Sequence, residues 1–218
     1  MKKLKPSRAV TAFVKITGAP GAFLFFKYKL YFENKAAQPK KLPKPCILMS
    51  NHTSLMDFVL YLTVFPTRYI RFLMAEVLFR KNALFSWLLF KLGGIYVDRD
   101  TKNLSFLSES VKVLEEGGTV GVFPQGRLPV GGKPWPFKPG IVLIALKSGA
   151  PIVPVYTDGR YGITKRARVI IGESIDLREL AVTAEPDDEE ITRLTALLEE
   201  KNESLRRKLE AMKEEEKK

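Results

Sequence analysis

The sequence predicts an α/β fold in which a mixed, mostly parallel sheet is flanked by helices. Short apolar runs such as Cys46–Met49 and Thr119–Phe123 end in polar or turn-forming residues, as buried strands do. Longer apolar or amphipathic stretches with helical spacing separate these runs. The chain has 218 residues, of which 45% are hydrophobic, and this suffices for one substantial core. We therefore expect a single domain over residues 1–218.

Three parts are expected within this domain. Residues 1–45 are basic and apolar, residues 46–180 form the α/β core, and residues 185–218 form a charged C-terminal helix. The net charge of +12 is uneven, because residues 1–45 carry eleven Lys or Arg and a single acid, Glu33. Such a segment is suited to the phosphates of lipid headgroups or of nucleic acid. The single cysteine cannot form an internal disulfide and indicates a reducing compartment.

The N-terminal segment is expected to form two short apolar helices, residues 9–17 and 22–32, around the turn-forming sequence Gly18–Gly21. The second helix mixes aromatic residues with lysines, as segments at a membrane interface do. We expect this pair to hold the protein on one leaflet as a peripheral or monotopic protein. Two alternatives stay open: a pair that packs on the domain's own core, and a hairpin that spans the bilayer. No stretch has the form of a cleavable signal peptide.

Nucleic-acid binding is the other function that a basic N-terminus suggests. Its only support is the charge with interleaved aromatic residues, and no recognisable nucleic-acid module is present. We therefore expect a lipid surface as the partner, and no nucleic acid.

The only histidine, His52, follows the predicted strand Cys46–Met49 in a polar loop. Ser54, or alternatively Thr53, has the pattern of a helix cap, and this places Asp57 in the first helical turn. Across such a bend, the carboxylate can reach the imidazole. An imidazole can take a proton from a hydroxyl, and a carboxylate on its other nitrogen fixes the tautomer and stabilises the imidazolium. The alternative is an ordinary loop histidine beside an ordinary capping residue.

The remaining elements follow from hydrophobic periodicity and turn signals. A turn and a short strand precede Arg99, and a proline-rich loop precedes the apolar helix that starts near Ile141. Predicted helices cover Asp57–Phe65, Val77–Leu92, Ser105–Glu116, Ile141–Lys147 and Glu185–Lys218, and further strands cover Arg68–Phe72, Ala150–Tyr156 and Arg166–Ile171.

Cations in the loops could hold a phosphate. Arg99 follows a short strand, Arg127 follows the turn at the end of Thr119–Phe123, and Lys138 lies in the proline-rich loop. A guanidinium offers a planar fork of donors that binds phosphate bidentately. The alternatives are a surface ion pair of Arg99 with a neighbouring aspartate and a solvated surface lysine at position 138.

The segment from Asn51 through His52 to Asp57 resembles the Asn-His-x-x-x-x-Asp signature of the glycerolipid acyltransferases, the lysophosphatidic acid acyltransferase family. Three further segments resemble the family's later motifs in the same order. They are Gly93–Arg99 for Gly-x-Ile-x-x-x-Arg, Phe123–Arg127 for Phe-Pro-Glu-Gly-Thr-Arg, and Ala150–Tyr156 for Val-Pro-Val. Each motif alone is unspecific, whereas four in matching order, over about Cys46 to Val155, are a strong signal.

The resemblance implies the glycerolipid acyltransferase fold. It also implies transfer of a fatty acyl group from acyl-CoA or acyl carrier protein to the hydroxyl of lysophosphatidic acid, a step of phospholipid biosynthesis. His52 would be the general base and Asp57 its partner. The residues that would bind substrate are Asn51, Arg99, Gln125, Gly126, Arg127 and Lys138. The protein is then expected at the cytoplasmic face of the cell membrane.

Neither a cofactor nor a metal is expected. The acyl donor is itself a substrate, and one histidine with one cysteine offers too few ligands of the usual zinc types.

The sequence departs from the family's third motif in two ways. Gln125 stands where the family usually has glutamate, and the threonine is absent, so that Arg127 follows Gly126 directly. A neutral amide repels a phosphate less than a carboxylate does, but it accepts a weaker hydrogen bond from a glycerol hydroxyl. Two alternatives stay open as a result: a different lysolipid acceptor, and a membrane-binding relative that has kept the fold without the chemistry.

Overall fold

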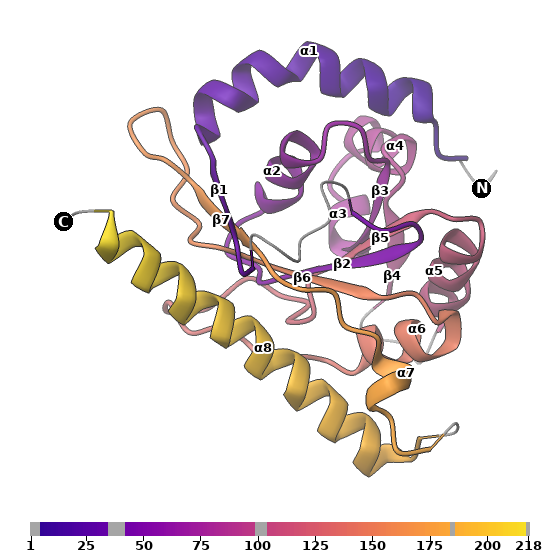
Figure 1. The fold of residues 1–218 in the computed structure, drawn as a ribbon. Coiled ribbons are helices and arrows are strands. Elements are labelled where there is room, and N and C mark those ends of the chain that lie inside the picture. Colours follow the sequence, from indigo (N-terminus) through magenta and orange to yellow (C-terminus); the bar gives the residue numbers. More distant parts are fainter. Residues whose placement is uncertain (1–4, 35–41, 99–103, 184–185, 217–218) are drawn as a thin grey trace.

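The computed structural model describes residues 5–34, 42–98, 104–183 and 186–216 (Figure 1). Within these residues the chain forms a seven-stranded sheet with the order β1-β7-β6-β2-β5-β3-β4. Neighbouring strands are parallel except for the antiparallel pair β6 and β7, and this confirms the predicted mixed, mostly parallel sheet. The strands are β1 Lys29–Phe32, β2 Cys46–Ser50, β3 Ile70–Ala75, β4 Ile95–Val97, β5 Thr119–Val122, β6 Ile152–Thr157 and β7 Arg168–Ile171.

Helices cover both faces of this sheet (Figure 1). One face carries α1 Arg8–Phe26, α2 Asp57–Val64, α3 Glu76–Phe79 and α4 Ala83–Lys91, and the other carries α5 Ser105–Glu115, α6 Gly140–Ser148, α7 Leu177–Leu180 and α8 Asp188–Glu215.

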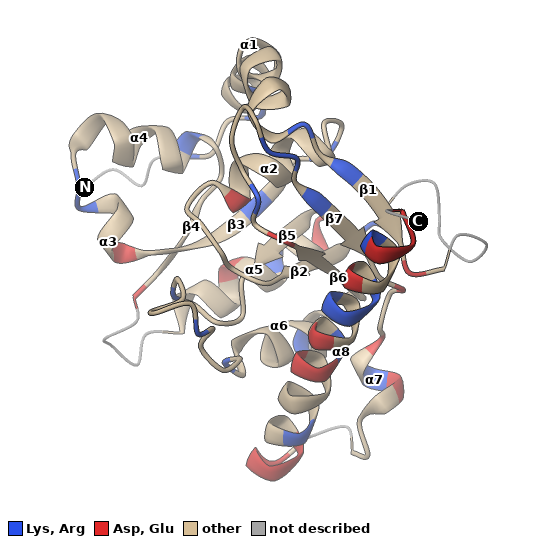
Figure 2. Ribbon diagram, turned by 90° about the vertical axis from the view of Figure 1, so that its left-hand side faces the viewer, with Lys and Arg blue, Asp and Glu red and all other residues tan. Residues whose placement is uncertain are grey.

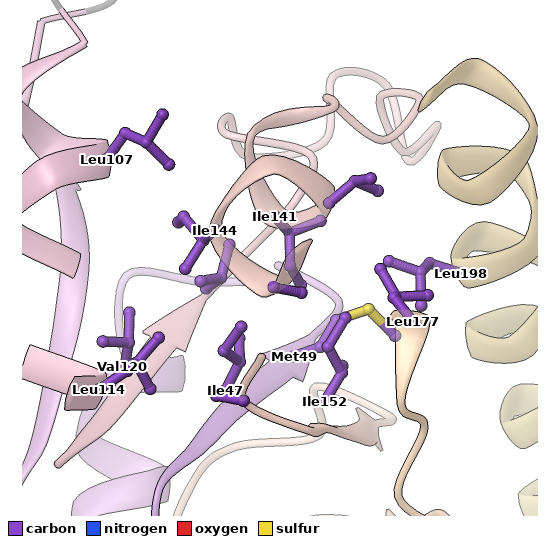
Figure 3. Packing of buried hydrophobic residues seen from close by; sticks show 14 of the residues in the cluster. Ile47, Met49, Leu107, Leu114, Val120, Ile141, Ile144, Ile152, Leu177 and Leu198 are labelled. Atoms are coloured by element: carbon purple, nitrogen blue, oxygen red, sulfur yellow. The ribbon is translucent and has the colours of Figure 1, made fainter. Parts of the chain in front are cut away.

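Strand β2 lies at the centre and contributes to both layers of the core. Side chains of a strand alternate between the two faces of a sheet. Ile47 and Met49 therefore pack with residues of α5, α6 and α8 (Figure 3). Cys46 and Leu48 point the other way and pack with residues of α1, α2 and α4. All five residues of β2 are buried, which explains why the first four are apolar.

The topology brings the loops that follow three parallel strands to one edge of the sheet. Strand β2 lies between β5 and β6, with Met49 paired to Val122 and Ser50 paired to Val155. The chain therefore leaves these three strands side by side. In open α/β sheets, this carboxyl edge is where loops form binding sites.

The N-terminal helix differs from the prediction. A break at Gly18–Gly21 was expected, but α1 is one helix of 19 residues that continues through Pro20. Pro20 is exposed and no atom packs near Gly18 or Gly21, so the distortion that a proline causes meets no resistance from packing. The helix ends at Lys27 in a left-handed conformation, and the residues expected to extend a second helix form β1 instead, paired with β7.

Helix α1 is long and apolar enough to cross a membrane, judged by its length and composition. Its mean hydropathy is 1.5, and only 11% of the apolar window is buried inside the protein. Figure 2 shows α1 almost free of charged residues, whereas α8 carries both signs along its length.

The segment Val77–Leu92 also differs from the prediction, because it contains a break. Helix α3 ends at Phe79, and α4 begins after Asn82, whose side-chain oxygen accepts a hydrogen bond from the backbone N–H of Phe85 at 2.7 Å. An asparagine cap of this kind starts a new helix. The prediction missed this break because apolar residues with helical spacing lie on both sides of it.

Candidate active site

His52 and Asp57 meet across the bend between β2 and α2. Nδ1 of His52 lies 2.8 Å from Oδ2 of Asp57. The same oxygen accepts hydrogen bonds from the backbone N–H groups of Thr53 at 2.6 Å and Ser54 at 2.9 Å. Asp57 is fully buried. The loop therefore wraps around the carboxylate. The cap predicted at Ser54 or Thr53 is wrong, because Met56 is the N-cap of α2 and its side chain makes no capping hydrogen bond, while the Ser54 hydroxyl accepts the backbone N–H of Met56 at 3.1 Å.

The second oxygen of this carboxylate is also engaged. Oδ1 of Asp57 accepts hydrogen bonds from the hydroxyl of Thr53 at 2.8 Å and from the hydroxyl of Tyr161. Burial and the neighbouring Asp57 raise the pKa of Tyr161, so its hydroxyl stays protonated and acts as the donor. Nothing in the sequence marks Tyr161 for this position, because it lies 104 residues after Asp57.

The imidazole ring of His52 is held by stacking. It lies against the ring of Phe123 with a centroid distance of 4.4 Å and an angle of 16°, and Phe123 stacks in turn on Phe72 at 5.6 Å and 12°. The His52 side chain is 15% exposed. With Nδ1 facing Asp57, the nitrogen that remains for an incoming hydroxyl is Nε2.

Gln125 supports the histidine loop from the neighbouring strand. Its side-chain oxygen accepts the backbone N–H of His52 at 2.7 Å, and Gln125 is buried. The loops after β2 and β5 are thereby joined. Gln125 was predicted to bind the acyl acceptor, but its side-chain oxygen has a partner within the protein.

Asn51 joins the loop after β2 to the end of β6. Its side-chain oxygen accepts from the backbone N–H of Thr157, and its amide donates to the backbone oxygen of Thr157, both at 2.9 Å. This predicted substrate-binding residue is buried and uses both ends of its amide to hold the backbone.

Two of the three predicted cations, Lys138 and Arg127, lie within the described residues. Lys138 is exposed, and its backbone N–H donates to the oxygen of Pro124 at 2.9 Å. Its side chain runs next to Gly126, where an added Cβ would come within 3.6 Å of it. Gly126 has a positive φ of 65°. Arg127 is exposed and lies over the ring of Trp135 at 5.6 Å. Arg99 lies outside the described residues.

A family model described as acyltransferase matches residues 30–158, which is more than half of the chain. The chain belongs to the acyltransferase family. The prediction from the four motifs is thereby confirmed, and the matched residues include the predicted site positions from Asn51 to Lys138.

Named relatives within this family share one description. The chain is 28% identical to the 1-acyl-sn-glycerol-3-phosphate acyltransferase beta of Homo sapiens, over 62% of this chain and 48% of the relative. It is 31% identical to the 1-acyl-sn-glycerol-3-phosphate acyltransferase of Borreliella burgdorferi, over 54% and 46%. The chain thus spans about half the length of these two curated relatives. It covers 83% of the corresponding enzyme of Bacillus subtilis, with 27% identity over 76% of this chain.

A solved acyltransferase has the same fold. The crystal structure of the 1-acyl-sn-glycerophosphate acyltransferase of Thermotoga maritima superposes with a TM-score of 0.62 at 26% identity. The match covers 93% of this chain and 78% of that one. The predicted acyltransferase fold is therefore confirmed over nearly the whole chain.

Proposed function

We propose that the protein transfers a fatty acyl group from acyl-CoA or acyl carrier protein to the hydroxyl of lysophosphatidic acid. The observation that carries this proposal is the 2.8 Å contact between Nδ1 of His52 and the buried carboxylate of Asp57, at the carboxyl edge of a family-matched sheet. The names of the relatives support the choice of substrate.

In the proposed reaction, Nε2 of His52 takes the proton from the acceptor hydroxyl as its oxygen attacks the thioester carbonyl. Asp57 holds the imidazole in the tautomer with a proton on Nδ1 and stabilises the imidazolium that forms. The tetrahedral intermediate then collapses, the bond from carbon to sulfur breaks, and the imidazolium returns its proton to the leaving thiolate. The products are the acylated lipid and the free thiol of the carrier.

The acceptor's phosphate would be held by the cations on the loop after β5. Arg127 and Lys138 are both exposed there, and Lys138 runs beside Gly126, next to the bond between Gln125 and the His52 backbone. A neutral Gln125 adds no negative charge to this loop. We keep Arg99 as a third candidate.

A membrane surface would supply the lipid acceptor. Phe13, Ile16, Phe23 and Leu24 of α1 are exposed and apolar, which suits insertion among lipid headgroups and acyl chains. We propose a peripheral or monotopic arrangement at the cytoplasmic face, with α1 lying along the bilayer surface.

The test is an acyl-transfer assay with the purified protein, lysophosphatidic acid and acyl-CoA or acyl carrier protein. His52→Ala should lose at least about 100-fold in kcat, since it removes the general base. Tyr28→Phe is a matched control, because Tyr28 lies in the same core layer and donates to Thr63 rather than to the site. Equal product from wild type and His52→Ala would refute the role of His52.

A screen of acceptors tests the phosphate assignment. Lysophosphatidic acid should be preferred to monoacylglycerol, and Lys138→Gln should raise KM for the first acceptor but not for the second. A preference for the acceptor without phosphate would contradict the roles of Arg127 and Lys138. Vesicle binding without transfer to any acceptor would favour a relative that has lost the chemistry.

A further inference from the structure

A cavity of about 260 Å³ opens on the edge of the sheet opposite to His52. It lies between the first half of α1, the residues that precede β3, and the turn that leads into β5. Its walls include Arg8, Lys15, Lys44, Arg68 and Tyr69. Lys44 precedes β2, whereas His52 follows the carboxyl end of β2, so the length of this strand separates the cavity from the candidate active site.

Arg68 is the most informative residue of this cavity. It is only 9% exposed, and its Nη1 nitrogen is buried without a hydrogen-bond partner in the described part of the chain. A buried guanidinium nitrogen without a hydrogen-bond partner is unfavourable, because it has lost its water and gained no acceptor in exchange. An anion in the cavity would remove that cost.

The surrounding charges have the same sign. Arg8, Lys15 and Lys44 line the cavity together with Arg68, and none of the described lining residues is acidic. Arg8 lies in the first turn of α1, which has no acidic residue, although the helix dipole favours negative charge there. The side chain of Arg8 lies over the ring of Tyr69 at 5.9 Å.

Lys15, unlike the Nη1 nitrogen of Arg68, has hydrogen-bond partners in the described part of the chain. Its ammonium donates to the backbone oxygens of Phe65 and Pro66, both at 3.2 Å, and to that of Arg68. These three bonds use its donors and fix α1 against the end of α2. Lys15 thus adds positive charge to the cavity, while Arg68 and Arg8 supply the N–H groups that an anion would contact.

We propose that this cavity binds the phosphate of an anionic lipid headgroup, at a site separate from the one that holds the acyl acceptor. The position of α1 indicates that the anion is the headgroup of a lipid rather than a free phosphate. Phe13 and Ile16 are 67% and 74% exposed, and they alternate along the helix with Thr11, Ala12 and Lys15, which line the cavity. A lipid whose chains lie along the apolar side of α1 would bring its phosphate to Arg68 and Arg8. The site would fix the orientation of the protein on the membrane.

Vesicle flotation with the full chain tests this proposal. Wild type should bind phosphatidylglycerol-containing vesicles more tightly than phosphatidylcholine vesicles. Arg68→Gln and Arg8→Gln should each reduce that preference by about fivefold, as expected for one cation at a lipid surface. Arg68→Lys keeps the charge and should retain most of the preference. His52→Ala should keep it fully, so that failure of the proposed transfer reaction and failure of this site can be distinguished.

The matched control is Lys81→Gln. Lys81 is an exposed cation between α3 and α4, on the same face of the sheet as α1 but outside the cavity. Diffuse attraction to an anionic surface would depend on exposed Lys81 at least as much as on buried Arg68. An equal loss in Lys81→Gln and Arg68→Gln would therefore overturn the proposal.

Two further measurements test whether the Arg68 variant is folded and whether the cavity binds a phosphate that does not belong to a lipid. In neutral detergent, Arg68→Gln should unfold at a temperature no lower than wild type, because the variant removes a buried nitrogen that has no hydrogen-bond partner among the described residues. If Arg68→Gln unfolds at a lower temperature, the vesicle preference of Arg8→Gln tests the site instead, because Arg8 is exposed. Inorganic phosphate and coenzyme A are each added to lipid-free protein. A rise of the unfolding temperature that depends on Arg68 for either compound, with no vesicle preference, would show that the site does not serve a lipid.

Discussion

The hydroxyl of Tyr161 donates a hydrogen bond to Oδ1 of Asp57, while Oδ2 of the same carboxylate faces Nδ1 of His52. Tyr161 also contacts the N-terminal helix, because its ring meets that of Phe26 edge-on at 5.1 Å. The next residue, Gly162, donates its backbone N–H to the oxygen of Phe25. The last turn of α1 is thus connected to the candidate catalytic carboxylate through one side chain.

Tyr161→Phe should weaken this connection without emptying the space that the ring fills. The carboxylate loses one of its donors, and a hydrogen bond to a charged group is worth about 1.5–3 kcal/mol. We expect that loss in the free energy of unfolding, together with a lower kcat and an unchanged KM, because Tyr161 holds the carboxylate and does not contact the substrate. Tyr28→Phe is the control, since its hydroxyl donates to the backbone oxygen of Thr63. The two variants should differ in kcat, and equal values would argue against a positioning role for Tyr161.

Asp57→Asn should leave the loop folded and remove most of the activity. An amide oxygen can still accept from the backbone N–H groups of Thr53 and Ser54, which hold the loop. These N–H groups hold the amide oxygen at the position of Oδ2, facing Nδ1 of His52. That oxygen is neutral, so it no longer stabilises the imidazolium that forms as His52 takes the proton. We expect kcat to fall by about 10²–10⁴-fold. Near-normal kcat in a folded variant would rule out this pairing.

Two substitutions at Gln125 test whether this residue holds the His52 loop or binds the acyl acceptor. Gln125→Glu keeps an oxygen that can accept the His52 backbone N–H, but it places a carboxylate at a buried position, so any loss of stability comes from burying that charge rather than from losing the bond. Gln125→Met removes that acceptor and leaves a buried N–H without a partner, which costs about 1–3 kcal/mol. Chemical unfolding and the acyl-transfer assay measure both variants. If Gln125→Met is as stable as wild type, the 2.7 Å bond does not hold the loop.

A glycine in β5 makes room for the stack beneath His52. A Cβ at Gly121 would lie 2.3 Å from ring atoms of Phe72, which itself stacks on Phe123. Gly121→Ala should therefore destabilise the fold by about 1–3 kcal/mol and lower activity, because the rings must shift. Gly21→Ala is the contrasting case, since no atom lies within 4 Å and α1 should gain up to about 1 kcal/mol of helix propensity. If unfolding curves show both variants to be less stable than wild type, or both to be more stable, this explanation is wrong.

The sequence by itself determined the features that depend on neighbours along the chain. Hydrophobic periodicity and turn residues predicted most of the strands and helices of the core, because burial of one face imposes those patterns locally. The motif from Asn51 to Asp57 predicted the pairing of His52 with Asp57, since both lie on one strand-to-helix bend. The family followed from motif order, and a family model confirmed it.

Only the tertiary structure decided which distant segments meet. The partner of β1 is β7, from the other end of the chain, and the bond of Tyr161 to Asp57 spans 104 residues. The strand order places β5 and β6 on either side of β2, and this brings Phe123, Gln125 and Thr157 around the histidine loop. These contacts depend on sheet topology rather than on local propensity, so no pattern in the neighbouring sequence carries them.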